Sequence, residues 1–133
     1  METAQEVLIA GGMLMLVLGV VTGNIMAMIR MNEPTVPRYL SLAHEGCYLQ
    51  GAMLLGLAVA AGLSDLSSGW ENAAAWMLVV GAVLLFTKDF LNWRLGVEDE
   101  FASKGIGLTL GFLMGPLHTI GIIILTVGVL GAL

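Results

Sequence analysis

Long apolar runs separated by short polar segments dominate this chain of 133 residues. A hydrocarbon core about 30 Å thick is crossed by roughly 20 helical residues. Four runs reach that length: 7–29, 39–63, 73–96 and 106–132. Backbone polar groups in lipid must be satisfied within their own segment, which favours helices. The pattern therefore predicts a single transmembrane domain, residues 1–133, with four spanning helices.

The segments between the runs are short and carry helix-breaking or polar residues: Asn32–Pro37, Ser64–Gly69 and Val97–Gly105. Short connections make successive helices antiparallel neighbours, so the expected fold is an all-α, up-down four-helix bundle. The 18 glycines favour close helix–helix packing. In the run 106–132, the glycines lie on more than one side of the predicted helix. This helix is therefore expected to contact several neighbouring helices, which points to a homo-oligomer.

Composition and charge support a membrane protein and exclude some partners. Only 11% of residues are charged and 58% are hydrophobic, whereas soluble domains carry roughly a quarter charged residues. The net charge is -5, largely from acids at the ends and in the connections, including Glu98–Glu100. No basic stripe exists to neutralise phosphates, so nucleic acid is not expected as a partner. The partners expected are membrane lipid and a small apolar molecule.

Basic residues indicate an orientation. Arg30, Arg38, Arg94 and Lys104 lie beside the first and third connections. By the positive-inside rule, these two connections face the cytoplasm and both termini face outward. We therefore expect a multi-pass protein of the bacterial inner (cytoplasmic) membrane.

His44, about one turn into the second run, is the first candidate functional residue. Neutral imidazole is the commonest protein ligand for metals, and His is a frequent haem ligand. The alternative is a hydrogen bond to a loop carbonyl. Cys47 and Gly51 follow at one-turn intervals on the same face, which would be narrow enough to admit a flat group. Cys47 could equally be a small buried apolar residue, and as the only cysteine it excludes an internal disulfide.

Gln50 lies about 120° further round the helix than His44. The two side chains would line adjacent walls of a cavity rather than one stripe. The alternative role for Gln50 is an interhelical hydrogen bond, which is common for glutamine in membrane spans.

Lys88, Asp89 and Asn92 form a polar group inside the third run. Ionisable residues are rare in hydrocarbon and usually face a bundle interior or a cavity. Asn92 can reach either charged residue, but Lys88 and Asp89 point about 100° apart, which weakens a direct pairing. The group is either an internal network that fixes packing or a polar wall that steers a substrate oxygen.

His118 follows Pro116 in the fourth run. Proline removes one helical hydrogen bond. His118 is therefore a candidate second axial ligand, or it bonds a freed carbonyl.

The segment Ala43–Gly51 (AHEGCYLQG) resembles a motif of styrene oxide isomerases and of the related hydroxylaminobenzene mutases. That motif is Ala-His, five residues, an amide and Gly, and Gln50 stands here where those proteins usually have Asn. Three further elements are similar to theirs and occur in the same order: Gly11–Met15, Leu91–Trp93, and Gly115-Pro116 with Gly121. The resemblance runs over nearly the whole chain.

The resemblance implies a four-helix membrane isomerase that assembles as a trimer and holds haem b near subunit boundaries. It implies His44 as the axial ligand of the haem iron. Cys47 and Gly51, which share its helix face, would then lie beside the cofactor. Gln50 and Asn92 would orient the substrate. Lys88 and Asp89 would tune the charge of the pocket.

Two reactions are compatible with the resemblance, and both rearrange a small apolar substrate without net redox change. In one, ferric haem acts as a Lewis acid that converts an epoxide to an aldehyde or ketone. In the other, an aryl hydroxylamine becomes an aminophenol. The chain departs from the isomerases at Lys88, where they carry an acidic residue, and at Gly96, where they carry tyrosine. It is also shorter than the isomerases, and in this it is closer to the mutases.

Two functions of other classes stay open from the residues alone. One is a small transporter or proton channel that uses Lys88, Asp89 and His118 as a relay. The other is a non-catalytic haem-binding subunit of a larger membrane complex.

Overall fold

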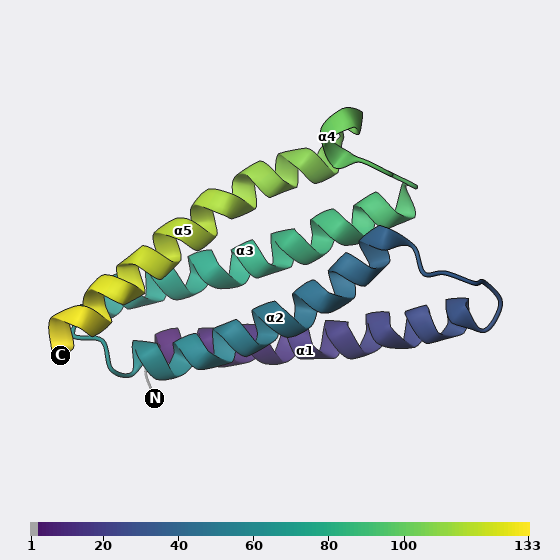
Figure 1. Cartoon of the computed structure of the whole chain (residues 1–133). Coiled ribbons are helices and arrows are strands. Elements are labelled where there is room, and N and C mark those ends of the chain that lie inside the picture. Colours follow the sequence, from purple (N-terminus) through teal and green to yellow (C-terminus); the bar gives the residue numbers. More distant parts are fainter. Residues whose placement is uncertain (1–2) are drawn as a thin grey trace.

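The computed structural model describes residues 3–133, which form an all-α bundle (Figure 1). Its helices are α1 (Thr3–Arg30), α2 (Arg38–Ala61), α3 (Ser68–Arg94), α4 (Glu100–Ser103) and α5 (Ile106–Ala132). The predicted all-α bundle of four long helices is confirmed. The predicted connection 97–105 differs, because it contains the short helix α4.

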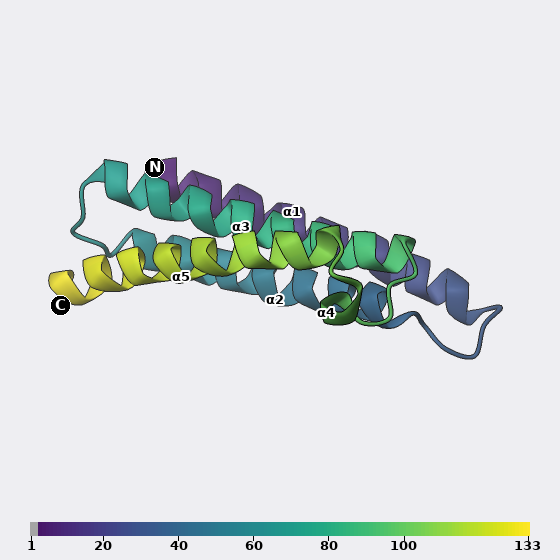
Figure 2. The ribbon, with the colours of Figure 1, turned by 90° about the horizontal axis from the view of Figure 1, so that it is seen from above.

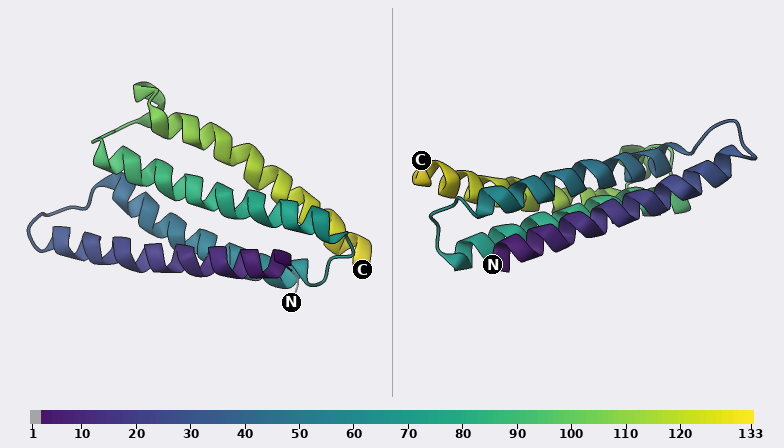
Figure 3. Two further views of the ribbon diagram at one scale, coloured as in Figure 1. Left: turned by 180° about the vertical axis from the view of Figure 1, so that it is seen from behind. Right: turned by 90° about the horizontal axis from the view of Figure 1, so that it is seen from below.

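The long helices form two antiparallel pairs, α1 with α2 and α3 with α5. Helix α3 also packs against α1 and α2, whereas α5 touches α2 only slightly. Figures 1 and 2 show α5 lying along α3, on the side away from α1. The start of α1, the end of α5 and the α2–α3 connection lie at one end of the bundle, and the other two connections lie at the opposite end (Figure 3).

Small residues let the helices approach closely. Alanines of α3, including Ala74, Ala75 and Ala82, are fully buried in the core. A Cβ on Gly12 would lie 3.1 Å from the Gly51 carbonyl oxygen, and one on Gly51 would lie 3.2 Å from that of Gly12. The α1 and α2 backbones are therefore in near contact, as glycine permits in membrane bundles.

Three helices are long and apolar enough to cross a membrane: α1, α3 and α5. Apolar side chains cover their outer surfaces, for example Val17 of α1 and Phe112 of α5, which are 56% and 70% exposed. These features suggest a multi-pass integral membrane protein. Helix α2 is not among the three, and within its 24 residues it carries His44, Glu45 and Gln50. Its crossing of the membrane stays a prediction.

The helix ends differ from the apolar runs for local reasons. Helix α3 begins at Ser68, five residues before the predicted run, with Glu71 in its first turn. A carboxylate there interacts favourably with the positive end of the helix dipole. Helix α4 begins because the Asp99 side chain accepts hydrogen bonds from the backbone N–H groups of Phe101 and Ala102, as an N-cap residue does.

Candidate functional site

A cluster of charged and polar side chains lies where α2 begins and α3 ends. We call its members, Tyr39, Lys88, Asp89, Asn92 and Glu100, the Lys88 cluster. Lys88 Nζ lies 2.7 Å from Asp89 Oδ1 and 3.0 Å from Glu100 Oε2. Asn92 Nδ2 donates to Glu100 Oε2 at 2.9 Å, and the Tyr39 hydroxyl accepts from the Glu100 backbone N–H at 3.1 Å. Each charged group thus has a partner within the cluster.

Helices α4 and α5 pack over the Lys88 cluster and position its side chains. The Asp99 cap starts α4, and α4 places Glu100 over Lys88 and Asn92. On α5, a Cβ at Gly107 would overlap the Asn92 amide, and one at Gly111 would lie 3.3 Å from Lys88 Cδ. Glycine at these two positions therefore lets α5 pack over the buried polar groups.

The sequence interpretation of this region was partly wrong. A direct Lys88–Asp89 pairing was expected to be weak, yet the two groups form an ion pair at 2.7 Å. The long lysine side chain bends across the angle that separates neighbouring helix positions. Asn92 can reach Lys88 or Asp89 by its spacing, but its side chain donates to Glu100. Glu100 was missed altogether, although Asp99 just before it is a residue typical of a helix N-cap.

His44 projects from α2 against α1. Its Nδ1 lies 2.9 Å from the Gly19 carbonyl oxygen and 3.3 Å from Thr22 Oγ1. A Cβ on Gly23 would lie 2.8 Å from His44 Cε1, so glycine provides the space for the ring. The Tyr48 ring meets it edge-on at 5.0 Å. The predicted alternative, a bond to a carbonyl, is present, although this carbonyl belongs to a helix and not to a loop.

The Nδ1 contact of His44 is one that an axial ligand of the group implied by the sequence resemblance would make. A metal-binding histidine almost always donates its second ring N–H to a carbonyl or carboxylate, which fixes the tautomer. With the proton on Nδ1 toward Gly19, the Nε2 lone pair remains available. No hydrogen bond within the described chain uses Nε2. His44 could therefore serve as a single axial ligand for haem iron.

Cys47 and Gly51 do not form an open face beside His44. Cys47 is fully buried, and its Cβ would lie 3.3 Å from a Cβ on Gly19. The space over Gly51 is filled by Leu16 of α1. Helix α1 therefore covers this face, and Cys47 is the small buried apolar residue that the alternative expected. A contact of Cys47 and Gly51 with a cofactor stays a prediction.

Gln50 and His118 join α2 to α5. His118 Nε2 donates to Gln50 Oε1 at 2.9 Å, and a Cβ on Gly81 of α3 would lie 2.8 Å from His118 Nδ1. The interhelical hydrogen bond considered for Gln50 is present. Gln50 and His44 contact different helices, so the structure does not bring them together.

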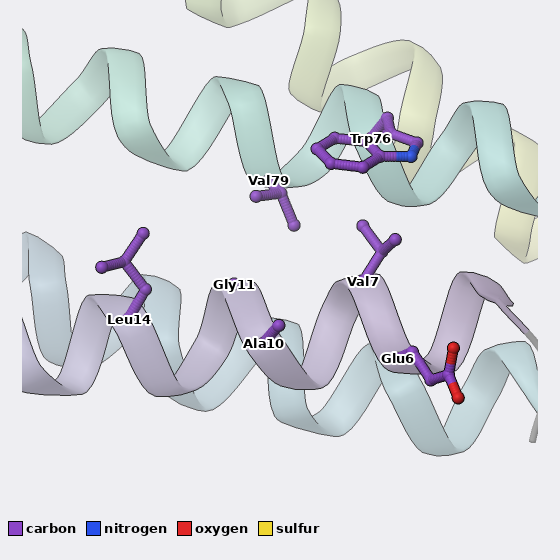
Figure 4. A pocket seen from close by; sticks show the side chains of 7 residues that line it. All are labelled: Glu6, Val7, Ala10, Gly11, Leu14, Trp76 and Val79. Carbon is purple, nitrogen blue, oxygen red and sulfur yellow. The ribbon is translucent and has the colours of Figure 1, made fainter.

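Other features of the described residues lie apart from these groups. Within 3–133, no three His, Cys, Asp or Glu side chains are placed to hold a metal ion together. An apolar pocket of about 380 Å³ lies between α1 and α3, lined among others by Val7, Leu14, Trp76 and Val79 (Figure 4). None of the predicted site residues lines it.

No protein-family model matches the chain, and no curated protein or solved structure matches it. The resemblance to styrene oxide isomerases and hydroxylaminobenzene mutases therefore stays a prediction.

Proposed function

We propose that the protein is a haem-b-binding integral membrane isomerase with His44 as the axial ligand. The observation that supports this most directly is the His44 ring, whose Nδ1 is fixed by the Gly19 carbonyl while Nε2 stays available. The apolar surfaces of α1, α3 and α5 suit a protein whose oily substrate partitions into lipid. A homotrimer, implied by the sequence resemblance, is part of the proposal.

The proposed reaction is the rearrangement of an epoxide to a carbonyl compound. Ferric haem, when bound, would supply a Lewis acid that polarises the epoxide oxygen without net redox change. The chain would hold the ligand ring in one tautomer through Gly19 and keep water out with the apolar helix surfaces. Gln50 lies apart from His44 and uses its Oε1 toward His118, so its role in orienting the substrate stays a prediction from the sequence resemblance. Rearrangement of an aryl hydroxylamine to an aminophenol is the alternative reaction.

The Lys88 cluster would have a supporting role in this proposal. Lys88 is enclosed by Asp89 and Glu100, and a closed network of this kind favours a packing function over a proton relay. This geometry weighs against the transporter alternative, which needs an ionisable group open to a pathway.

The absorption spectrum of the detergent-purified protein tests haem binding. We expect a Soret band that disappears in His44→Ala. His118→Ala is the matched control, because these are the only two histidines in the chain, and it should keep the band. A colourless wild-type protein, or a band lost only in His118→Ala, would contradict the assignment.

Product analysis then tests catalysis. Styrene oxide and phenylhydroxylamine are incubated with the haem-loaded protein and with His44→Ala. Conversion of one substrate by the wild type alone supports an isomerase and identifies its type. A haem-loaded protein that converts neither would be a haem-binding subunit. A flux of protons or of a small solute across proteoliposome membranes would instead favour a transporter, if Lys88→Met abolishes it.

A further inference from the structure

A polar cavity of about 530 Å³ lies at the end of the bundle where α2 ends and α3 begins. Gln5 of α1, Gly62 after α2, Ser64 of the connection, and Ser68 and Glu71 of α3 line it. The start of α2 and the end of α3 lie at the opposite end of the bundle (Figure 1). His44 and the Lys88 cluster belong to those parts of the two helices. The cavity is therefore separate from the proposed haem site.

Glu71 is the charged residue of this cavity, and it is only 5% exposed. Both ion pairs of the described chain belong to Lys88, and none of its side-chain hydrogen bonds reaches the Glu71 carboxylate. A buried carboxylate without a partner is costly, so such groups are normally paired or bind a cation. The Glu71 oxygens are not among the enclosed polar atoms that lack a partner, so they open into the cavity, where a cation can reach them.

No basic side chain of residues 3–133 lies at this end of the bundle. All five basic residues belong to the opposite half of the bundle: Arg30, Arg38, Lys88, Arg94 and Lys104. The other charged residues near the cavity end, Glu6 and Asp65, are acidic. The carboxyl end of α2 at Ala61 adds the negative pole of one helix dipole, and the amino end of α3 at Ser68 adds the positive pole of another. Because these poles oppose each other, the acidic side chains decide the sign of the charge at this end, and they favour a cation.

The size and ligands of the cavity indicate which kind of cation. One carboxylate with neutral oxygens matches a single positive charge, and no group of three acidic or metal-binding side chains is present among residues 3–133. A volume of about 530 Å³ falls in the range of pockets for small organic molecules. Gln5 donates its Nε2 to the Ala58 carbonyl, which leaves Gln5 Oε1 as an acceptor. These groups suit N–H donors.

We propose that this cavity binds a primary ammonium group, with the Glu71 carboxylate as its counter-ion. The ammonium group could belong to a free small amine or to the ethanolamine headgroup of a lipid, because the cavity lies at the ends of the spanning helices. The chemistry recognised is the same in both cases. The proposal does not depend on haem binding at His44.

Thermal unfolding of the full-length protein tests the proposal, because a ligand that binds the folded state raises Tm. Ethanolamine is titrated into detergent-purified protein, and nanodiscs of phosphatidylcholine are compared with nanodiscs that also contain phosphatidylethanolamine. The variants are Glu71→Gln, which removes the charge, and Asp65→Asn, which removes an exposed carboxylate at the same end. Ser68→Leu keeps Glu71 but fills part of the cavity, and it has room because Ser68 is exposed.

We expect a Tm increase in the wild type and in Asp65→Asn, and binding at least about tenfold weaker in Glu71→Gln, because a charge-assisted hydrogen bond is lost. Ser68→Leu should also bind weakly, and this variant decides the question if Glu71→Gln does not fold. A Tm increase with ethanolamine identifies a free amine as the ligand. A Tm increase seen only in phosphatidylethanolamine nanodiscs identifies a lipid headgroup as the ligand. No increase in either arm, equal binding by Glu71→Gln, or stabilisation by calcium or sodium chloride alone would overturn the proposal.

Discussion

Glu100 and Lys88 form an ion pair across the end of a helix, with Glu100 Oε2 3.0 Å from Lys88 Nζ. Glu100 belongs to α4, outside the third apolar run, whereas Lys88 lies within it. The pair fastens the α3–α5 connection to the interior of the bundle. Because Asp89 also pairs with Lys88, one buried cation is shared by two carboxylates, and the Asn92 amide supplies a further donor to Glu100.

Glu100→Gln should destabilise the protein by about 1–3 kcal/mol, because it removes a charged partner from a buried lysine. The free energy of unfolding in a detergent–denaturant titration measures this. Glu98→Gln removes a neighbouring but exposed carboxylate, so it should change stability by less than about 0.5 kcal/mol. Equal effects of the two substitutions would mean that Glu100 does not hold the connection.

Gly107→Ala tests the space that α5 leaves for the Lys88 cluster. The added Cβ would overlap the Asn92 amide, so either the Asn92–Glu100 bond breaks or α5 shifts. We expect a loss of about 1–3 kcal/mol, as for other overpacked sites. Gly115→Ala on the same helix meets nothing within 4 Å and should be neutral. The comparison is made by thermal unfolding at matched detergent concentration.

The apolar runs were sufficient to predict the four long helices and their antiparallel order. Length and hydropathy fix these features because lipid allows few other structures. The predicted helix ends were less accurate. A helix extends beyond its apolar run where a capping residue or a favourable charge allows it, as at the start of α3 with Ser68 and Glu71.

Partners across helices could not be predicted, because they depend on helix rotation and on the reach of flexible side chains. The Gln50–His118 bond joins residues 68 positions apart, and no local pattern links them. In the sequence, Glu100 is one of three consecutive acidic residues, a pattern typical of a solvated loop. In the structure, the Asp99 cap starts α4, and this short helix directs Glu100 toward Lys88. The packing of α1 over Cys47 and Gly51 could not be predicted for a similar reason. The spacing of Cys47 and Gly51 places both on one face of α2. Their small side chains suggested room for a ligand, but they also allow α1 to pack closely against this face.

A double-mutant cycle tests the Gln50–His118 hydrogen bond. Gln50→Leu and His118→Phe each remove one partner, and the double variant removes both. Hydrogen bonds between membrane helices average about 0.6 kcal/mol, with a maximum near 1.7, so a coupling energy in that range is expected from unfolding titrations. Additive effects would show that α2 and α5 are not joined at this point.

Gly23→Ala tests whether His44 is held as the proposed ligand requires. The new Cβ would lie 2.8 Å from His44 Cε1, and it would push the ring away from the Gly19 carbonyl. If the protein binds haem, we expect a weaker and shifted Soret band. Gly56→Ala, which meets no atom within 4 Å, should leave the spectrum unchanged. A Gly23→Ala spectrum identical to that of the wild type would argue against His44 as the ligand.

The single thiol offers a direct test of the α1–α2 packing. Cys47 is fully buried, so a maleimide should label the folded protein slowly and the denatured protein completely. A variant with Cys47→Ser and Ser103→Cys carries its thiol at an exposed position of α4 and should react at once in both states. Mass spectrometry after timed quenching measures the labelled fraction. Rapid labelling of Cys47 in the folded protein would mean that its face is open after all, and this would restore the space for a flat cofactor that α1 fills in the structure.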